Sequence, residues 1–178
     1  KQVHGGKIFR IENTGDYQGE EGDGMITTAC GIPMAIQVAD CAPIALICET
    51  PVMGIVHAGW RGLRAGIIQN ACIEMRKLGG HPTIAVVGPC IYPKHYEFGS
   101  VELKHMTREF GPTVESETKE GTPALDIPET ARIALLRSNI LDTQFIGECT
   151  ASSGKYWSHR VGGNIERQAM VAWLEEAS

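Results

Sequence analysis

Two apolar segments in the middle of the chain predict a β-hairpin. Residues 43–48 and 52–59 are almost continuously apolar, and the polar residues 49–51 between them favour a tight turn. If the turn is centred on this break, Pro43 lies opposite His57 in the neighbouring strand. The pattern therefore predicts two paired apolar strands.

This hairpin brings a thiol and an imidazole to the same end of the predicted sheet. Side chains alternate between the two faces of a strand, so Cys41, Pro43 and His57 are expected on one face. A shift of one residue in the register would turn Cys41 to the opposite face. The pair is the first candidate for chemistry in this chain.

Elsewhere the apolar spacing alternates between the period of a strand and the period of a helix, which predicts an α+β fold. We expect one domain over residues 1–178, built from layered mixed β-sheets flanked by helices. Exposed loops are expected at 13–24 and 115–122. Short strands are expected at Lys1–Gly5, Lys7–Glu12, Pro33–Ala39, Thr83–Ile91 and Gln144–Thr150. Helices are expected at 59–78, at 96–110 and from Ile127 to Ile140. The segment Asn164–Glu176 is expected to form a helix or a strand-to-helix element.

Composition and charge exclude several classes of function. The net charge is −5, and the lysines and arginines are scattered, which argues against a nucleic-acid partner. No run of 18 apolar residues exists and no signal peptide opens the chain, so we expect no membrane partner and a cytoplasmic location. The oligomeric state cannot be read from the sequence.

The six cysteines form no CxxC motif, which favours reduced thiols over a disulfide framework. We interpret Cys30, Cys48, Cys72 and Cys149 as small core residues. Cys90 follows Gly88 and Pro89 at a strand end and is the only thiol besides Cys41 that could take part in chemistry. The histidines at 81, 95, 105 and 159 stand in polar surroundings and are expected at the surface.

His4 is a third candidate, because it stands at the end of its own predicted strand. A lone histidine of this kind is usually structural or faces solvent. Together, however, His4, Cys41 and His57 would give zinc three ligands and leave one coordination position open, as in catalytic zinc sites. Their spacings of 37 and 16 residues match no short zinc motif, so the spacing alone does not decide the question.

Residues next to these three suggest further roles. Asp40 could orient a ligand, act as a base, or only cap the turn before Pro43. A helix beginning directly after His57 would present free N–H groups, and Arg61 and Arg64 add positive charge beside it, which suits phosphate. In the alternative interpretation, the connection is merely tight and the two arginines are solvated.

Eight motifs, taken in order, resemble the YfiH-like laccase-domain family, whose members are often labelled multicopper polyphenol oxidases. The resemblance covers nearly the whole chain and implies that His4, Cys41 and His57 are zinc ligands. The family usually has a further segment upstream of the first motif, which is not part of this sequence, and Glu166-Arg167 stands where the family has Gly-Arg. The motifs are KQVHG (1–5), GDGMIT (22–27), VADCAPI (38–44), VHAGWRG (56–62), GPCI (88–91), LDI (125–127), CT (149–150) and SHR (158–160).

The resemblance also implies an activity: zinc-dependent phosphorolysis of adenosine, inosine and methylthioadenosine to the free base and a pentose 1-phosphate, with adenosine deamination alongside. Purine nucleoside and phosphate are then the small-molecule partners. Phosphate is expected near Arg61, Asp40 is expected to steer or deprotonate, and Trp60 or Tyr96 is expected to line the purine slot. The copper label is chemically less persuasive, because six histidines without a His-x-His pair cannot surround several copper ions.

Two other functions stay open at this point. In a metal-free scheme, Cys41 is a nucleophile activated by His57, and the protein is an amidase acting on a peptidoglycan precursor. Alternatively, the three residues form a metal-binding or redox-sensing module without catalysis. Chelators and thiol-blocking reagents distinguish the enzymatic schemes, and the absence of turnover in zinc-containing protein would favour the module.

Overall fold

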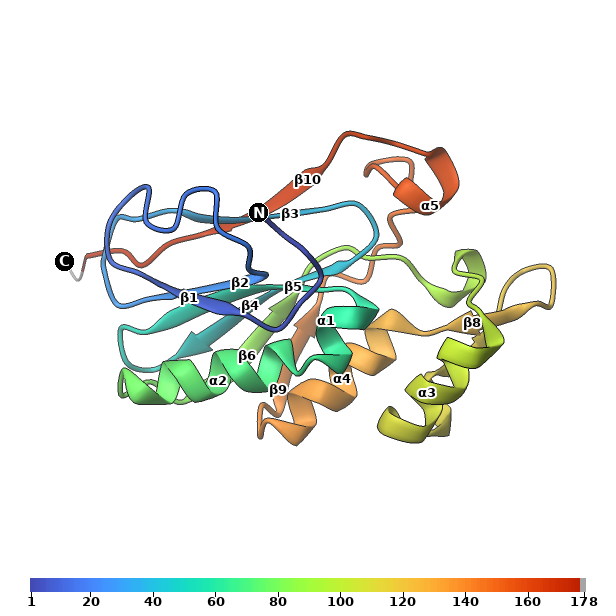
Figure 1. Ribbon diagram of the computed structural model, residues 1–178, viewed down its shortest axis with the longest axis horizontal. Coiled ribbons are helices and arrows are strands. Elements are labelled where there is room, and N and C mark those ends of the chain that lie inside the picture. Colours follow the sequence, from blue (N-terminus) through green and yellow to red (C-terminus); the bar gives the residue numbers. More distant parts are fainter. Residues whose placement is uncertain (177–178) are drawn as a thin grey trace.

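The predicted hairpin forms the middle of a six-stranded mixed sheet in the computed structural model, which describes residues 1–176 (Figure 1). β4 (Ala42–Cys48) and β5 (Met53–Ala58) pair antiparallel, with Pro43 opposite His57 as predicted. Most residues of both strands are buried, because the sheet is covered on its two faces. The hairpin therefore holds its register within the core.

Four further strands complete the sheet in the order β1-β2-β5-β4-β6-β9. They are β1 (Ile8–Ile11), β2 (Gly24–Thr27), β6 (Pro82–Val87) and β9 (Asp142–Phe145). The two outer pairs, β1 with β2 and β6 with β9, are parallel, and the inner pairs are antiparallel. The sheet is thus mixed, as the sequence predicts.

Different elements cover the two faces of the sheet (Figure 1). On one side lie α1 (Trp60–Arg64), α2 (Ile67–Lys77) and α4 (Ile127–Arg137), with α3 (Ser100–Phe110) beyond α4. On the other side lies an antiparallel ribbon of β3 (Met34–Val38) and β10 (Gln168–Ala172). Helices, sheet and ribbon form the layers of one α+β domain, which confirms the predicted fold class.

Each interface between layers has its own hydrophobic core. The larger core joins the sheet to the helices and includes Leu46, Ile67 and Met75, all fully buried. The smaller core joins the sheet to the ribbon and includes Ile36 and Ile55. Burying one such side chain contributes about 1.5–3 kcal/mol, so both interfaces hold the layers firmly.

The helix predicted for residues 59–78 is divided into α1 and α2. Gly66 lies between them with φ 72°, a left-handed conformation that glycine adopts without the usual steric cost. Leu63 of α1 and Ile67 of α2 both stay buried across the break. The apolar spacing therefore continues through a change of direction, which is why the sequence predicts a single helix.

Near the C-terminus, where the sequence predicts a helix or a strand-to-helix element, the helical part of the prediction is wrong. Within Asn164–Glu176 the structure has the strand β10, in which exposed and half-buried side chains alternate. Met170 pairs with Ile36 in the middle of the ribbon. Five residues are too few for periodicity to separate a strand from a helix. A short helix, α5 (His159–Gly162), precedes β10.

Several element boundaries also differ from the prediction. Lys1–Gly5 is irregular, because its backbone N–H groups bond to a buried carboxylate instead of a neighbouring strand. The polar segment 115–122, predicted as a loop, contains an exposed strand. This strand, β7 (Glu115–Glu117), follows the 3₁₀ turn Pro112–Val114 and pairs with β8 (Pro123–Leu125). The helix α3 starts only at Ser100, after the 3₁₀ turn Pro93–His95. The strands β6 and β9 end earlier than predicted, at Val87 and Phe145.

The six cysteines are free thiols, as predicted, although their burial differs. Cys72 and Cys90 are buried, and Cys48 and Cys149 are half-buried. Cys30 is exposed in the connection between β2 and β3, so its assignment to the core is wrong.

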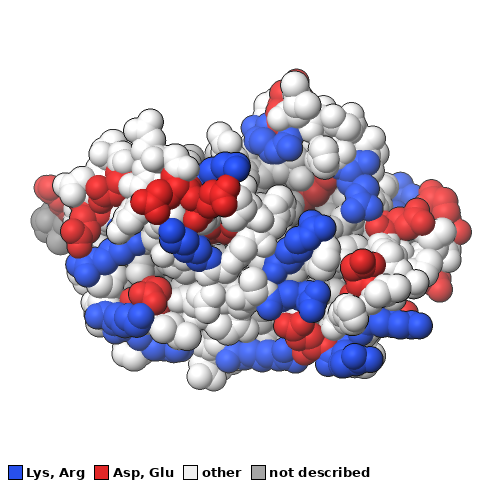
Figure 2. Space-filling model, viewed as in Figure 1, with Lys and Arg blue, Asp and Glu red and all other residues white. Residues whose placement is uncertain are grey.

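The surface mixes charges of both signs. Figure 2 shows Lys and Arg interspersed with Asp and Glu over the face drawn, without a large field of one sign. Among residues 1–176, no helix is long and apolar enough to cross a bilayer.

Candidate metal centre

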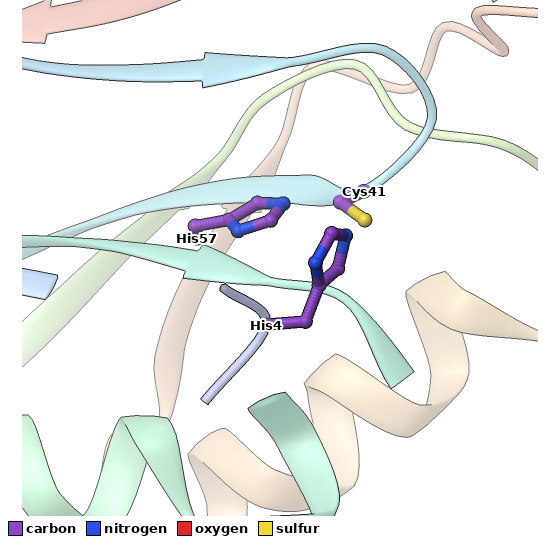
Figure 3. A group of neighbouring side chains, drawn as sticks. All are labelled: His4, Cys41 and His57. Carbon is purple, nitrogen blue, oxygen red and sulfur yellow. The ribbon is translucent and has the colours of Figure 1, made fainter. Parts of the chain in front are cut away.

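Three side chains from separate parts of the chain converge at one end of the sheet (Figure 3). Cys41 directly precedes β4, His57 lies in β5, and His4 comes from the irregular N-terminal segment. One nitrogen of each histidine and the sulfur of Cys41 all lie within 4.8 Å of one another. The structure thus brings together the three residues that the sequence singles out.

This donor set fits a single metal ion. Zinc binds a thiolate at about 2.3 Å and imidazole nitrogen at about 2.0–2.1 Å, which places the donor atoms about 3.5 Å apart around a tetrahedron. Small side-chain rotations bring atoms that lie within 4.8 Å of one another to that separation. His4 is exposed and Cys41 is half-buried, so the remaining coordination position can face solvent.

Asp23 fixes the orientation of the His57 ring. Oδ1 of its fully buried carboxylate lies 2.8 Å from Nδ1 of His57. Burial acts to raise the Asp23 pKa, but hydrogen bonds from His57 and three backbone amides hold that pKa below its ordinary value. Because an ionised carboxylate only accepts, Nδ1 carries the proton, and Nε2 is left as the donor atom for a metal.

The same carboxylate also holds His4. It accepts hydrogen bonds from the backbone N–H groups of Val3, His4 and Gly5, at 2.7 to 3.1 Å. His4 has φ 61°, a conformation that costs a residue with a side chain about 1–2 kcal/mol. The hydrogen bonds offset this cost, so one buried aspartate positions two of the three candidate ligands.

Sequence reasoning missed Asp23, although a signal was present. Gly22 and Gly24 flank it, and a Cβ at either position would collide with Phe9 or Ile8 of β1. The two glycines thus let the segment pass close to β1. An acidic residue between two glycines, directly before a strand, is the pattern that could have identified it.

The three side chains also change one another's acidity. Burial acts to raise the Cys41 pKa, but hydrogen bonds with His4 and His57 lower that pKa to about 7. Burial acts to lower the His57 pKa, but Asp23 and Cys41 raise that pKa to about 9. Without a metal, the site therefore favours a thiolate beside an imidazolium, and the thiolate is the form that binds metals.

Asp40 does not bond to this cluster. Its Oδ1 accepts a hydrogen bond from the Thr150 hydroxyl and its Oδ2 accepts one from the Arg160 backbone N–H, both at 2.7 Å. Its backbone has φ 94°. Of the three roles expected for Asp40, the structure supports only fixing the turn before β4, which it ties to the C-terminal segment.

α1 begins in contact with the cluster. A Cβ on Gly59, which precedes Trp60, would lie 2.7 Å from Cys41 Sγ. The half-buried Trp60 ring packs edge-to-face on Phe98 at 5.3 Å, and the Arg61 guanidinium lies 4.5 Å from the centre of the Trp60 ring. Arg61 is thus held against Trp60, two residues after the glycine that contacts Cys41.

Arg64 lies away from the site and pairs with Glu109 of α3 at 3.2 Å. Its charge is therefore already matched, contrary to the expectation that it adds positive charge beside a phosphate. The division of the predicted helix also leaves α1 with only five residues.

A cleft of about 700 Å³ opens beside the cluster. His4, Cys41 and His57 line it, together with apolar residues of β1 and β3. Asp40, Trp60 and Arg61 do not line it. Among its other lining residues are four that the sequence did not identify as site residues: Phe9, Tyr17, His159 and Arg167.

Comparison with known proteins places the chain in a family. Residues 1–175 match the family model for multi-copper polyphenol oxidoreductase laccase. The chain is 32% identical to "Purine nucleoside phosphorylase ORF3" of Streptomyces griseus, over 98% of this chain and 72% of that protein. It is also 32% identical to a purine nucleoside phosphorylase of Deinococcus radiodurans, over 97% of this chain and 68% of that protein.

Solved structures share the fold. YlmD from Geobacillus stearothermophilus superposes with a TM-score of 0.87 at 27% identity, over 98% of this chain and 72% of that one. YfiH from Bacillus licheniformis gives a TM-score of 0.85 at 24% identity, over 98% and 72%, which shows the fold alone. With the family match spanning almost every residue, the chain belongs to the family described as multi-copper polyphenol oxidoreductase laccase.

Proposed function

We propose that this protein is a zinc-dependent purine nucleoside phosphorylase that also deaminates adenosine. Its substrates are adenosine, inosine and methylthioadenosine, with phosphate as the second substrate. The proposal rests on one observation above all: two imidazoles and a thiol lie within 4.8 Å of one another at the wall of a cleft. The names of its relatives in Streptomyces and Deinococcus support it.

His4, Cys41 and His57 would hold the zinc ion, and Asp23 would keep His57 in the tautomer that binds it. When bound, zinc supplies Lewis-acid polarisation of a substrate oxygen or of water. Among residues 1–176, these three form the only cluster of at least three potential metal-ligating side chains. One such cluster suits one ion better than the several copper ions of an oxidase.

Different residues around the cluster would bind the nucleoside and the phosphate. The cleft can accept the nucleoside, and the Tyr17 ring, stacked on Phe9 at 4.6 Å, offers a flat surface for a base. The Trp60 ring is already covered by Phe98 and Arg61, which disfavours it as the purine slot. Arg61 would supply positive charge for phosphate, and Asp40 would position the Cys41 turn.

The direct test is a purine-release assay with a measurement of metal content. We expect zinc-loaded protein to release hypoxanthine from inosine only when phosphate is present, and to convert adenosine to inosine without phosphate. A chelator should abolish both reactions, and added zinc should restore them. Bound zinc without turnover of any purine nucleoside would refute the enzymatic proposal and leave a metal-binding module.

One observation favours a second candidate, a cysteine amidase acting on a peptidoglycan precursor. The Cys41 pKa of about 7, beside an imidazolium at His57, is the electrostatic state of an activated nucleophile. Amide cleavage that survives a chelator and is lost on alkylation of Cys41 would support this scheme. Loss of activity with a chelator, restored by zinc, would eliminate it.

A further inference from the structure

A row of aromatic rings outside the cleft connects two arginines. The Arg61 guanidinium lies 4.5 Å from the centre of the Trp60 ring, which contacts Phe98 at 5.3 Å. Phe98 in turn contacts Tyr96 at 5.5 Å, and the Arg160 guanidinium lies 4.6 Å from the centre of the Tyr96 ring. The row therefore carries a cation at each end.

Both ends of the row are attached to the residues around Cys41. At one end, Gly59 packs so closely on Cys41 that a Cβ there would lie 2.7 Å from Sγ. At the other end, the backbone N–H of Arg160 donates to Asp40, the residue before Cys41, at 2.7 Å. Two exposed arginines are thus anchored near the same thiol.

The charges of these two arginines are not neutralised by carboxylates. The arginines that form ion pairs within residues 1–176 are Arg10, Arg64 and Arg132, each with a glutamate. Arg160 donates from Nη1 to the Glu97 carbonyl at 2.7 Å, and its other guanidinium N–H groups have no partner within the described residues. Stacking on an aromatic ring holds a guanidinium in place without occupying its N–H groups.

Tyr96 adds a neutral donor between the two cations. Its ring is buried, but within the described residues its hydroxyl has no hydrogen-bond partner and is not among the atoms sealed from solvent. Burial is the largest cause that raises the Tyr96 pKa to about 12, and the nearby Cys41 is the next largest. The hydroxyl therefore keeps its proton. The positive charges of Arg160 and Arg61 act to lower this pKa, and the carboxylate of Asp40 acts to raise it.

We propose that Arg61, Arg160 and the Tyr96 hydroxyl form a clamp that binds the phosphate substrate beside Cys41. Phosphate is tetrahedral and doubly charged, and a guanidinium matches two of its oxygens with parallel N–H groups. A nucleoside is neutral and gains little from two free cations. This inference rests on the proposed function for the identity of the anion, whereas the binding of an oxyanion rests on the three side chains.

The clamp and the cleft would then act on one reaction from two sides. In phosphorolysis, an oxygen of hydrogen phosphate forms a bond to C1′ of the ribose while the bond from C1′ to the base breaks. The electron pair of that bond leaves with the base nitrogen, and the proton of hydrogen phosphate ends on the base. The clamp would hold the other phosphate oxygens and aim one at C1′.

Binding of inorganic phosphate to zinc-loaded protein, measured by calorimetry without nucleoside, tests the clamp. We expect Arg61→Met and Arg160→Met each to weaken phosphate binding by about tenfold to a hundredfold, since each removes hydrogen bonds to a charged group. Tyr96→Phe should weaken it by up to about tenfold. Arg64→Met, on the same helix as Arg61 but paired with Glu109, should bind like the wild type.

Kinetics separates this inference from the proposed function. In an active enzyme, the two arginine variants should raise the KM for phosphate and leave the KM for inosine nearly unchanged. If inosine is cleaved but both variants bind phosphate as Arg64→Met does, the clamp is wrong and the activity stands. If no nucleoside is cleaved but both variants lose phosphate binding, the clamp stands and the proposed activity fails.

A conservative variant covers the possibility that Arg160→Met does not fold, because that variant loses the contact with the Glu97 carbonyl. Arg160→Lys keeps the charge but not the planar fork, so phosphate binding should weaken by about tenfold while zinc content stays normal. Unchanged phosphate binding in Arg160→Lys would overturn the role of the Arg160 fork.

Discussion

Two buried aspartates lie next to the candidate ligands, Asp23 in space and Asp40 in sequence, and they have different hydrogen-bond partners. Asp23 accepts from the His57 ring and from the backbone around His4, so it positions two candidate ligands. Asp40 is adjacent to Cys41 in sequence, yet it accepts from Thr150 and Arg160. The role of each carboxylate is therefore decided by the groups that donate to it, and not by its proximity to the site in sequence.

The two aspartates also connect regions at very different distances along the chain. Asp23 and His57 are 34 residues apart and meet because β2 pairs with β5. Asp40 reaches Thr150 and Arg160, 110 and 120 residues away. Asp23 therefore organises the cluster from its position directly before β2, whereas Asp40 bonds to the C-terminal segment.

The largest effect should come from Asp23→Asn. The amide cannot accept hydrogen bonds from His57 and from all three backbone N–H groups, as the carboxylate does. Neither the tautomer of His57 nor the backbone of His4 is then fixed. We expect zinc affinity to fall by about ten- to a hundredfold, with turnover falling in parallel. Breaking the buried pair with His57 should also lower the free energy of unfolding by about 3–5 kcal/mol.

Zinc titration and thermal unfolding of wild type and Asp23→Asn measure these effects. His81→Asn, a change at an exposed histidine, is the control and should leave both quantities unchanged. Wild-type zinc affinity in Asp23→Asn would show that Asp23 does not organise the cluster.

A second variant perturbs Cys41 without touching either aspartate. In Gly59→Ala, the new methyl group would lie 2.7 Å from Cys41 Sγ and 3.1 Å from His4 Cδ2, so at least one ligand must move. We expect zinc affinity to fall by about tenfold, because ligands must be held within about 0.5 Å of productive geometry. Competition with a zinc chelator measures the affinity.

Gly54→Ala is the matched control for that variant. It lies in the same strand as His57, but its new methyl group would approach Ile26 and Met75 in the helix-side core. This control should lose stability while keeping wild-type zinc affinity. Equal loss of zinc affinity in the two variants would mean that general loosening, and not contact with Cys41, lowers the affinity.

Asp40→Asn should have a smaller effect on the metal than Asp23→Asn. The variant weakens two buried hydrogen bonds to the C-terminal segment, which should cost about 1–3 kcal/mol of unfolding free energy. Zinc affinity should change by less than about threefold, because Asp40 contacts no ligand side chain. A loss of zinc as large as that in Asp23→Asn would erase the distinction between the two aspartates.

The smallest effect is expected from Thr150→Val. It removes the hydroxyl that donates to Asp40 Oδ1 but keeps the shape of the side chain. The free energy of unfolding should fall by about 1 kcal/mol, with zinc content and turnover unchanged. Chemical denaturation measures the change, and Thr28→Val serves as its control, because Thr28 is exposed and its side chain makes no hydrogen bond within residues 1–176.

Parts of the site could be predicted from the sequence because local rules determine them. The hairpin register follows from two apolar segments and a short polar break, and it places Cys41 near His57. The position of His4 depends on Asp23, which holds an irregular segment where a strand was predicted. The glycines around Asp23 mark it locally, but no local pattern reports which segment it bonds to, because residues 4 and 23 meet only when β1 pairs with β2.

Two other differences have equally physical causes. The sequence predicts three possible roles for Asp40, and its position beside Cys41 does not reveal the bonds that tie its carboxylate to the C-terminal segment. The sequence predicts a helix or a strand-to-helix element around β10 because five residues are too few to show a clear period, and the pairing of β10 with β3 decides its structure. In both cases a contact between distant residues overrides the local pattern.

The most direct test of the central claim is zinc K-edge X-ray absorption on the wild type and on Cys41→Ala, with purine release measured on the same samples. For the wild type we predict one sulfur at about 2.3 Å and two imidazole nitrogens at about 2.0–2.1 Å. In Cys41→Ala, the sulfur signal, the bound zinc and the turnover should be lost together while the fold persists. Full zinc occupancy with normal turnover in Cys41→Ala would contradict the assignment of these three residues.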